Sequence, residues 1–422
     1  MGKQFDTANK PKYKWVILVV CFMMEFICLG FCSSNAGMYL TAITSALGFE
    51  RSLFSLNTSF RYIVSILLSL WFGALVKKFG VKKLVYAGLA ALIASTFLYA
   101  FSNELYQFYL AGALLGAGVI LTGSTMAGTI IRQWFDKDVG KYTGIALSAN
   151  GIGGALAAQV ISPIINNGEP FGYRGAYVLS AVVVLVFSIV IVIFLKEPVG
   201  KVATASKSKK TASWEGLEYN QVLKKGYFYC TAAMVFFSGI CLESISHTGI
   251  AHLTDSGINA EYVAAVASVS SLILTVAKIV IGILYDKKGL RFTMLMCHSM
   301  MFIAYILIVF ADATPFGKIA GMAAMVLSRL ALPLETVMIP LMSGDMFGNK
   351  SLVSVMGVFV AMKSAGSCID APICNLVFDL TGSYIPIYIA FGVMMIIVTV
   401  LFQLVITSAY KDKKLLEAKA ES

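Results

Sequence analysis

Five residues that can carry charge stand inside long apolar stretches of this sequence. They are Glu243, His247, Lys278, Lys363 and Asp370. Two ammonium groups facing one apolar cavity would attract an anion and hold a small carboxylate as point charges. Glu243 and His247 are one helical turn apart, and an imidazole beside a carboxylate can share and pass a proton. The residue types therefore predict anion binding by Lys278 and Lys363, with proton coupling or charge balancing by Glu243, His247 and Asp370.

The composition places these charges in a membrane protein. Of the 422 residues, 58% are hydrophobic and 13% are charged, and the mean hydropathy is +0.82, whereas soluble domains are typically about 25% charged. Apolar runs of about 18 residues or more recur along the chain, and each can cross roughly 30 Å of hydrocarbon. The short alternating strands of a transmembrane barrel do not occur in the sequence. We therefore predict an all-α membrane protein.

Twelve membrane-spanning helices are predicted, in two halves. The polar, basic linker 196–226 is the longest stretch between two apolar runs, and it separates residues 1–195 from residues 227–422, whose last part is a short tail. The expected spans are 15–40, 54–76, 84–101, 106–131, 142–165, 176–195, 227–250, 262–284, 292–311, 317–342, 353–378 and 384–408.

Lysine and arginine are distributed unevenly between the two sides of this arrangement. Outside the spans, one side has only Arg51, Arg174 and Lys318, and the other side has all the rest. Because positively charged loops stay in the cytoplasm, both termini and the linker are predicted to be cytoplasmic. The net charge of +11 has this explanation, so no nucleic-acid partner is expected.

The sequence has no pattern for catalysis or for metal binding. The eight cysteines lie in or next to apolar runs, without C-x-x-C or Cys/His spacing, so we interpret them as small packing residues. No nucleophile–base set or metal-ligand spacing occurs near a membrane surface. We expect no enzymatic activity, no cofactor and no metal.

Two loops repeat each other along the chain. Residues 73–83 read GALVKKFGVKK, and residues 282–292 read GILYDKKGLRF. At a constant offset of 209 residues, Gly73 matches Gly282, Gly80 matches Gly289, and Lys82 matches Arg291. Two halves in the same orientation form a parallel repeat, in which substrate binds near mid-membrane.

The repeated loop resembles the signature G-x-x-x-D-[R/K]-x-G-x-[R/K] of the major facilitator transporters. The second copy fits at Gly282, Asp286, Lys287, Gly289 and Arg291. The first copy departs from the signature, because Lys77 stands where the acid is expected. The resemblance implies two pseudo-symmetric six-helix halves, and loops that help to close an inward gate through charge contacts at helix ends.

A narrower resemblance, to the oxalate:formate antiporter and monocarboxylate transporter group, covers nearly the whole chain. It lies in RQWFDKDVGKYTGIALSANGIGGALAAQVISPII and the GYRGAY that follows, although Val139 replaces a usual basic residue. In this group an arginine of the eighth span binds the substrate carboxylate, and AKIVIG places Lys278 there. The oxalate:formate branch usually has a lysine in the eleventh span, where MGVFVAMKSAGS places Lys363.

Two departures separate the chain from the animal monocarboxylate transporters. Leu274 stands where they usually have an acid, and Ser34 lies in the SSN stretch where they have a lysine late in the first span. The resemblance therefore leans to the bacterial antiporter branch. Tyr39 stands where the group tends to place an aromatic facing the cavity. Its hydroxyl could donate to a carboxylate, or the ring could simply pack.

Each intramembrane charge also has a plainer interpretation. Such a charge costs at least about 2.5–3.5 kcal/mol, so it needs a partner, a water-filled cavity or a route to the interface. Lys278 is about two turns from the end of its span and could snorkel, whereas Lys363 lies ~16 Å into its span at 1.5 Å per residue. His247 could lie in water near the outer end of its span. Asp370 could neutralise Lys363 or pair across helices.

Four further charges lie within spans. We expect Arg61 to snorkel or to pair with an acid, and Arg329 and Glu335 to form ion pairs with neighbours around Pro333. For Glu25, a cavity-facing role and a helix-bridging role are equally open.

Together these features predict a transporter of the bacterial inner membrane that moves a small mono- or dicarboxylate by alternating access. An empty site with two uncompensated lysines should resist closure, which favours obligatory exchange or entry of a proton with the anion. The alternative is a proton-coupled symporter of lactate- or pyruvate-like acids. A sensor without transport is a third hypothesis, for which the termini and linker offer little room. We expect a monomer whose partners are the anion, the lipid bilayer and, for symport, protons.

Overall fold

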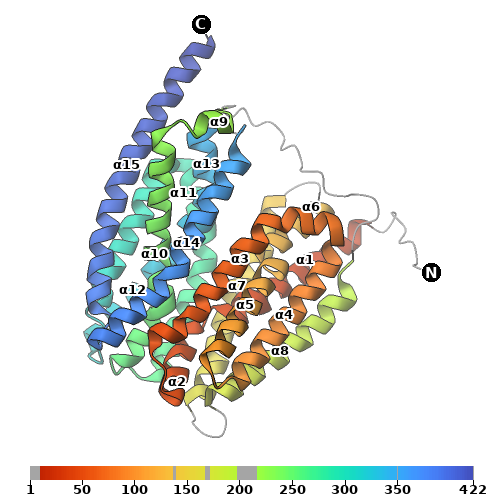
Figure 1. The fold of residues 1–422 in the computed structure, drawn as a ribbon, viewed down its shortest axis with the longest axis vertical. Coiled ribbons are helices and arrows are strands. Elements are labelled where there is room, and N and C mark those ends of the chain that lie inside the picture. The colour runs from red at the N-terminus through yellow and green to blue at the C-terminus, as the bar shows by residue number, and fades with distance from the viewer. Residues whose placement is uncertain (1–9, 136–138, 167–171, 197–215, 349, 422) are drawn as a thin grey trace, which may run out of the picture. The chain divides into compact units, whose positions relative to one another are not determined.

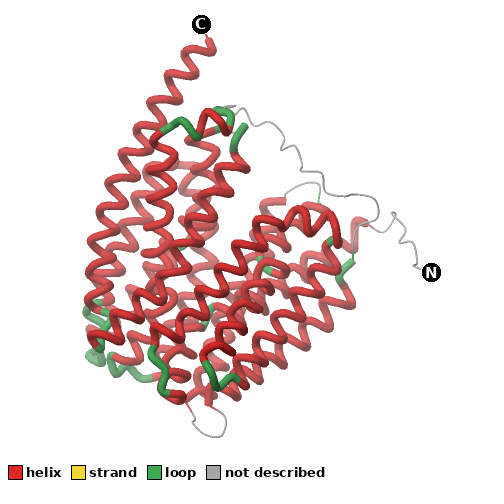
Figure 2. The backbone as a smooth tube through the Cα atoms, in the orientation of Figure 1, coloured by secondary structure: helices red, strands yellow, loops and turns green. Residues whose placement is uncertain are grey.

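Figure 1 shows the computed structural model of the chain, which describes residues 10–135, 139–166, 172–196, 216–348 and 350–421. These residues are almost entirely helical, and no strand occurs among them (Figure 2). They form two compact units. The first unit is Met1–Ser208 with Ala260–Thr275, and the second unit is Lys209–Asn259 with Val276–Ser422.

The first unit contains the first six predicted spans. Its described helices are α1 (Lys10–Glu25), the π-helix η2 (Phe26–Phe31), α2 (Ala36–Leu47), α3 (Arg51–Phe79), α4 (Val81–Phe101), α5 (Leu105–Thr122), α6 (Ser124–Trp134), α7 (Val139–Asn166) and α8 (Gly172–Phe194). The first span is α1, η2 and α2 in succession. The fourth span is α5 and α6, separated at Gly123, whose backbone is extended.

The second unit contains the other six predicted spans, except for residues 260–275 of the eighth span, which group with the first unit. The described helices after the linker are α9 (Tyr219–Val222), α10 (Gly226–Asp255), α11 (Ala260–Ile308), α12 (Pro315–Ala331), the π-helix η3 (Leu334–Met338), α13 (Ile339–Phe347), α14 (Leu352–Thr381) and α15 (Ile385–Glu421). α11 holds the eighth and ninth spans, joined at Gly289. The tenth span is α12, η3 and α13, and it is interrupted next to Pro333.

The helices have the lengths and hydropathy of membrane spans. In the described part of the chain, nine helical segments are long and apolar enough to cross a membrane. One of them, Ala260–Ile308, holds two predicted spans. The two predicted spans outside these nine are the interrupted tenth span and α14, which has Lys363 and Asp370 in its middle. Every predicted span is therefore a helix or a broken helix in the structure.

The repeat seen in the two loops is also present in the backbone. Gly80 has φ 76° and ψ 161°, and Gly289 has φ 77° and ψ 176°, a region that is essentially open to glycine alone. Gly48 and Gly257, which are also 209 residues apart, have φ 69° and 77°. The two halves thus turn at equivalent residues with equivalent conformations.

The same offset relates two helix crossings, one in each unit. In the first unit, a Cβ atom on Gly30 would lie 2.7 Å from the Cα atom of Gly153 and 3.1 Å from the backbone nitrogen of Gly154 on α7. In the second unit, a Cβ atom on Gly239 of α10 would lie 2.6 Å from the carbonyl oxygen of Lys363 on α14. Gly30 and Gly154 correspond to Gly239 and Lys363 in the repeat. Backbones therefore touch at the same place in both units.

Residues 260–275 of α11 group with the first unit because they bond to α7. The Nε2 atom of Gln159 donates to the Ser268 hydroxyl over 2.8 Å, and the Thr275 hydroxyl donates to the carbonyl of Ser148 over 3.2 Å. A Cβ atom on Gly151 would lie 2.0 Å from the Thr275 hydroxyl oxygen. The sequence placed the boundary between the halves in the linker 196–226, of which residues 197–215 lie outside the described residues.

Candidate functional site

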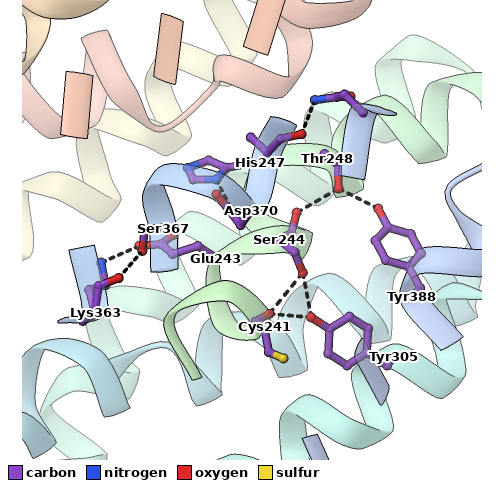
Figure 3. A network of polar contacts seen from close by, with 12 residues as sticks. Cys241, Glu243, Ser244, His247, Thr248, Tyr305, Lys363, Ser367, Asp370 and Tyr388 are labelled. Atoms are coloured by element: carbon purple, nitrogen blue, oxygen red, sulfur yellow. Dashed lines mark hydrogen bonds and ion pairs between the residues drawn. The ribbon is translucent and has the colours of Figure 1, made fainter. Parts of the chain in front are cut away.

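Helices α10 and α14 hold four of the charged residues singled out in the sequence. Glu243 and His247 lie on α10, and Lys363 and Asp370 lie on α14 (Figure 3). These helices are also in backbone contact at Gly366, beside the crossing at Gly239. A Cβ atom added at Gly366 would lie 2.3 Å from the carbonyl oxygen of Phe236. At such a short separation, a side chain of one helix can reach a side chain of the other.

The charges form two pairs across the α10–α14 crossing. The Nζ atom of Lys363 lies 3.0 Å from Oε1 of Glu243, and Nδ1 of His247 lies 2.8 Å from Oδ2 of Asp370. The Asp370 side chain is fully buried, and the other three side chains are 14–16% exposed. A buried charge needs a partner of opposite sign, and each carboxylate has a basic partner here. Each basic group contacts the facing helix, so Glu243 contacts Lys363 and Asp370 contacts His247.

An adjacent face of α10 is held by neutral hydrogen bonds. The Tyr305 hydroxyl lies 2.6 Å from the Ser244 hydroxyl and 2.5 Å from the carbonyl oxygen of Cys241, to which it donates. The hydroxyls of Thr248 and Tyr388 are 2.9 Å apart. Positions 241, 244 and 248 recur at helical spacing, so they share a face of α10 that is different from the face of Glu243 and His247. Sequence reasoning missed this face, although its three- and four-residue spacing was a usable signal.

A small pocket lies beside Lys363 in the second unit. It encloses about 260 Å³ of empty space together with its mouth. Its lining residues are Val235, Ser238, Gly239, Met294, Leu334, Met338, Ile339, Met342, Lys363 and Phe402. Most of this lining is apolar, so the Lys363 ammonium group is its strongest attraction for an anion.

The two predicted anion-binding lysines are both partly buried in the second unit. Lys278 lies on α11, and Lys363 lies on α14. Of these two described residues, Lys363 lines the pocket and Lys278 does not. The third predicted binding residue, Tyr39, is buried in the first unit, with its ring stacked on Tyr177 at 3.9 Å and its hydroxyl 3.5 Å from Ser180. The substrate-binding roles of these three residues stay predictions.

Arg329 was not predicted as a binding residue, but its surroundings are unusual. It lies on α12 and is only 7% exposed. Its Nε atom has no hydrogen-bond partner, and no carboxylate described in the structure lies within 4 Å of its guanidinium. Glu243 is nevertheless within electrostatic range of it. The expected ion pair of Arg329 is therefore not seen among the described side chains, which do not include that of Glu335.

The other intramembrane charges are found in different settings. Glu25 is fully buried on α1, and Arg61 is half-buried on α3. Glu335 lies in η3, but its side chain is outside the described part of the structure.

The repeated loops differ in their contacts. In the second copy, Arg291 donates to the Thr407 hydroxyl over 2.5 Å, and its carbonyl accepts from Gln403, which joins the loop to α15. Asp286 and Lys287 in this copy are exposed. In the first copy, Gly73 is open to solvent or lipid, and Lys82 lies over the ring of Tyr86 at 5.6 Å. Gating by the two loops, Gly73 to Lys82 and Gly282 to Arg291, stays a prediction.

The first unit has no charge at the positions equivalent to Glu243 and Lys363. Ser34 and Gly154 stand there, and a Cβ atom on Gly154 would lie 2.9 Å from the Cβ atom of Ser34. The Ser34 hydroxyl donates to the carbonyl of Leu29 over 2.7 Å. The repeat therefore preserves the helix crossing, and the charge pair is confined to the second unit at these positions.

Comparison with known proteins agrees with this architecture. The family model described as Major Facilitator Superfamily matches residues 21–369 and 257–421. Over 347 residues the chain is 25% identical to monocarboxylate transporter 12 of Xenopus laevis, covering 75% of this chain and 72% of that protein. Over 291 residues it is 22% identical to YcxA of Bacillus subtilis (strain 168), described as an uncharacterized MFS-type transporter, covering 68% and 69%.

A solved structure has the same fold. The nucleoside transporter NupG matches with a TM-score of 0.76 and 15% sequence identity, covering 95% of this chain and 99% of that chain. At this identity the likeness concerns the arrangement of helices alone.

Proposed function

This chain belongs to the Major Facilitator Superfamily, and we propose that it is a secondary transporter that exchanges small organic anions by alternating access. It is a multi-pass membrane protein of twelve spans in two six-helix halves. The proposed substrates are mono- or dicarboxylates of the formate, oxalate, lactate or pyruvate type. The proposed location is the bacterial inner membrane, with both termini in the cytoplasm and the monomer as the working unit.

The observation that carries this proposal is Lys363 on the wall of an apolar pocket. A buried ammonium group in hydrocarbon is costly, and the contact with Glu243 offsets that cost. An anion that enters the pocket meets a single strong attraction, the Lys363 charge. Relatives that are described as monocarboxylate transporters support a carboxylate as that anion. Lys278 is the proposed second cation, at the position where the resemblance places an arginine.

We propose exchange because a bound carboxylate lowers the cost of closing the site. Lys363 contacts Glu243, so it is not the uncompensated lysine that the sequence predicted. The buried Arg329 guanidinium, whose Nε has no acceptor among the described residues, is the cation that a carboxylate would compensate. After releasing one anion, the transporter then returns to its starting conformation fastest with another anion bound, and transport takes the form of exchange.

The alternative is proton-coupled symport, and the His247–Asp370 contact favours it. Histidine changes its charge near neutral pH, and a neighbouring carboxylate can share its proton. A proton taken up there would compensate the negative charge of an incoming carboxylate. Glu243, one turn from His247, is the other candidate for proton transfer.

Uptake of labelled carboxylates by proteoliposomes separates these mechanisms. The four probes are formate, oxalate, lactate and pyruvate, each with and without unlabelled anion inside and with and without an imposed pH gradient. Exchange predicts uptake that requires internal anion, whereas symport predicts uptake driven by external acid alone. If the wild-type protein moves none of the four probes under any of these conditions, carboxylate transport is wrong.

A further inference from the structure

We propose that Arg329 is a carboxylate-binding residue, and that Glu243 is an internal anion that occupies the substrate's place when the site is empty. This inference rests on the proposed function, because it names further binding groups of the same site. The substrate it predicts has a carboxylate small enough to bridge the Lys363 ammonium group and the Arg329 guanidinium.

The first argument is the burial of Arg329 without a carboxylate partner among the described side chains. A guanidinium group has five N–H donors in a planar fork, which matches the two oxygens of a carboxylate. Here the side chain is 93% buried and its Nε–H has no acceptor among the described residues. A buried donor without an acceptor is costly. A bound carboxylate would supply an acceptor for this donor.

The second argument is that, among the described side chains, two cations lie near the single carboxylate of Glu243. The carboxylate of Glu243 contacts Lys363 at 3.0 Å and is within electrostatic range of Arg329. Asp370, the nearest other acid on α14, already contacts His247. One carboxylate therefore serves two cations, so a second carboxylate can be accommodated with a gain in Coulomb energy.

The third argument is the position of Arg329 on a broken helix. The α12 helix ends at Ala331, and the π-helix η3 begins at Leu334. Leu334 and Met338 of η3 line the same pocket as Lys363. Interrupted helices commonly line substrate sites in transporters, and π-helical turns often occur at functional positions. Arg329 is thus only a few residues along the chain from Leu334, which lines the pocket.

Binding then becomes an exchange of one carboxylate for another. The substrate carboxylate approaches Lys363 through the pocket and takes the ion pair that Glu243 makes in the empty protein. Arg329 donates to the same substrate group, with both oxygens available to its fork. No covalent bond forms or breaks, and Glu243 is released from Lys363. Glu243 competes with the substrate, so its charge should lower the affinity for the substrate.

This competition can be tested, because it predicts whether removing the Glu243 charge raises or lowers the affinity for the carboxylate. The full-length protein in lipid nanodiscs is titrated with formate, oxalate and lactate, with chloride as the anion control, and binding is followed by equilibrium dialysis of the labelled acids. The variants are Arg329→Gln, Arg329→Lys, Glu243→Gln and the double variant Arg329→Gln/Glu243→Gln. Lys318→Gln is the matched control, because it removes a cation from the beginning of the same helix.

We expect Glu243→Gln to bind the carboxylate about tenfold more tightly, because the internal competitor is gone. We expect Arg329→Lys to bind at least about tenfold more weakly, because charge is kept but the fork is lost. Arg329→Gln should bind still more weakly, and Lys318→Gln should bind as the wild type does. The double variant removes one charge of each sign, so it should fold and still bind more weakly than Glu243→Gln.

Two results would overturn the inference while the proposed function stands. One is weaker binding by Glu243→Gln, which is the result expected of a purely structural ion pair. The other is a double variant that folds and binds as tightly as Glu243→Gln, which would show that Arg329 does not touch the substrate. A wild-type protein that binds none of the three acids would overturn the proposed function and this inference together.

Discussion

The imidazole of His247 and the carboxylate of Asp370 lie 2.8 Å apart, across two helices that are in backbone contact. Asp370 is fully buried, so the pair is shielded from water on its acidic side. A second pair, Lys363 with Glu243, lies along the same crossing. On α10 the acid, Glu243, comes before the base, His247, whereas on α14 the base, Lys363, comes before the acid, Asp370. Each helix therefore contributes one acidic and one basic group to the crossing.

The His247–Asp370 pair should show energetic coupling in a double-mutant cycle. We expect His247→Gln and Asp370→Asn each to lower the thermal stability of the purified protein. The double variant should lose about 1.5–3 kcal/mol less stability than the sum of the two single losses, a coupling typical of hydrogen bonds to charged groups. The measurement is unfolding followed by circular dichroism in detergent. Additive losses would show that the two groups do not depend on each other.

Transport should depend on the charge of Lys363. We expect Lys363→Gln to abolish carboxylate uptake, since the pocket then has an apolar wall and Glu243 is left without its ammonium partner. Lys363→Arg should keep measurable uptake, because the positive charge is retained. The assay is proteoliposome exchange, normalised to correctly inserted protein by protease accessibility. Uptake by Lys363→Gln at the wild-type rate would contradict the proposed site.

The α10–α14 crossing should tolerate no added methyl group. We expect Gly239→Ala and Gly366→Ala each to destabilise the protein by about 1–3 kcal/mol, because the new Cβ atom meets backbone at 2.6 Å and 2.3 Å. Gly357→Ala is the matched control on α14, since nothing lies within 4 Å of its Cβ position. The control should be neutral or slightly stabilising, as alanine favours helix. Equal melting temperatures for all three variants would contradict the crossing.

The equivalent loop glycines should respond in parallel. We expect Gly80→Ala and Gly289→Ala each to cost about 1–3 kcal/mol, because both residues have a backbone conformation that side chains strongly disfavour. Gly73→Ala and Gly282→Ala, in the helices before these loops, have open space at Cβ and should cost nothing. Thermal melts of the four variants check this. A loss confined to one loop would mean that the two copies are not equivalent.

Much of the fold could be predicted from the sequence, because whether a segment spans the membrane depends directly on its apolar composition. The twelve spans needed only runs of apolar residues, and the halves needed only the polar linker and the loop repeat. The breaks at Gly123 and beside Pro333 were not predicted, although Pro333 was visible. Apolar runs have the same hydropathy whether the helix is continuous or broken.

The candidate site was predicted in part, since residue type is local but partner choice is not. The chemistry of Glu243, His247, Lys363 and Asp370 is evident from their placement in apolar runs. Their pairing across α10 and α14 depends on a helix crossing set by glycines far apart in sequence. The repeat offset of 209 residues relates Gly30 to Gly239, and this match could have indicated the crossing.

Arg329 shows the limit of reasoning from neighbours in sequence. Glu335 and Pro333 nearby suggested a local ion pair. Among the described side chains, which do not include that of Glu335, the acid within electrostatic range of Arg329 is Glu243, on another helix, and Lys363 contacts it. Competition between cations for one carboxylate appears only when three helices are placed together.

The paired crossings have a consequence for the history of the chain. Duplication of a six-helix ancestor would give both copies the contact now seen at Gly30 and at Gly239. Ser34 and Gly154 in one copy correspond to Glu243 and Lys363 in the other. The two copies therefore keep the same close backbone contact and differ in what stands beside it, two small uncharged residues in one copy and an ion pair in the other.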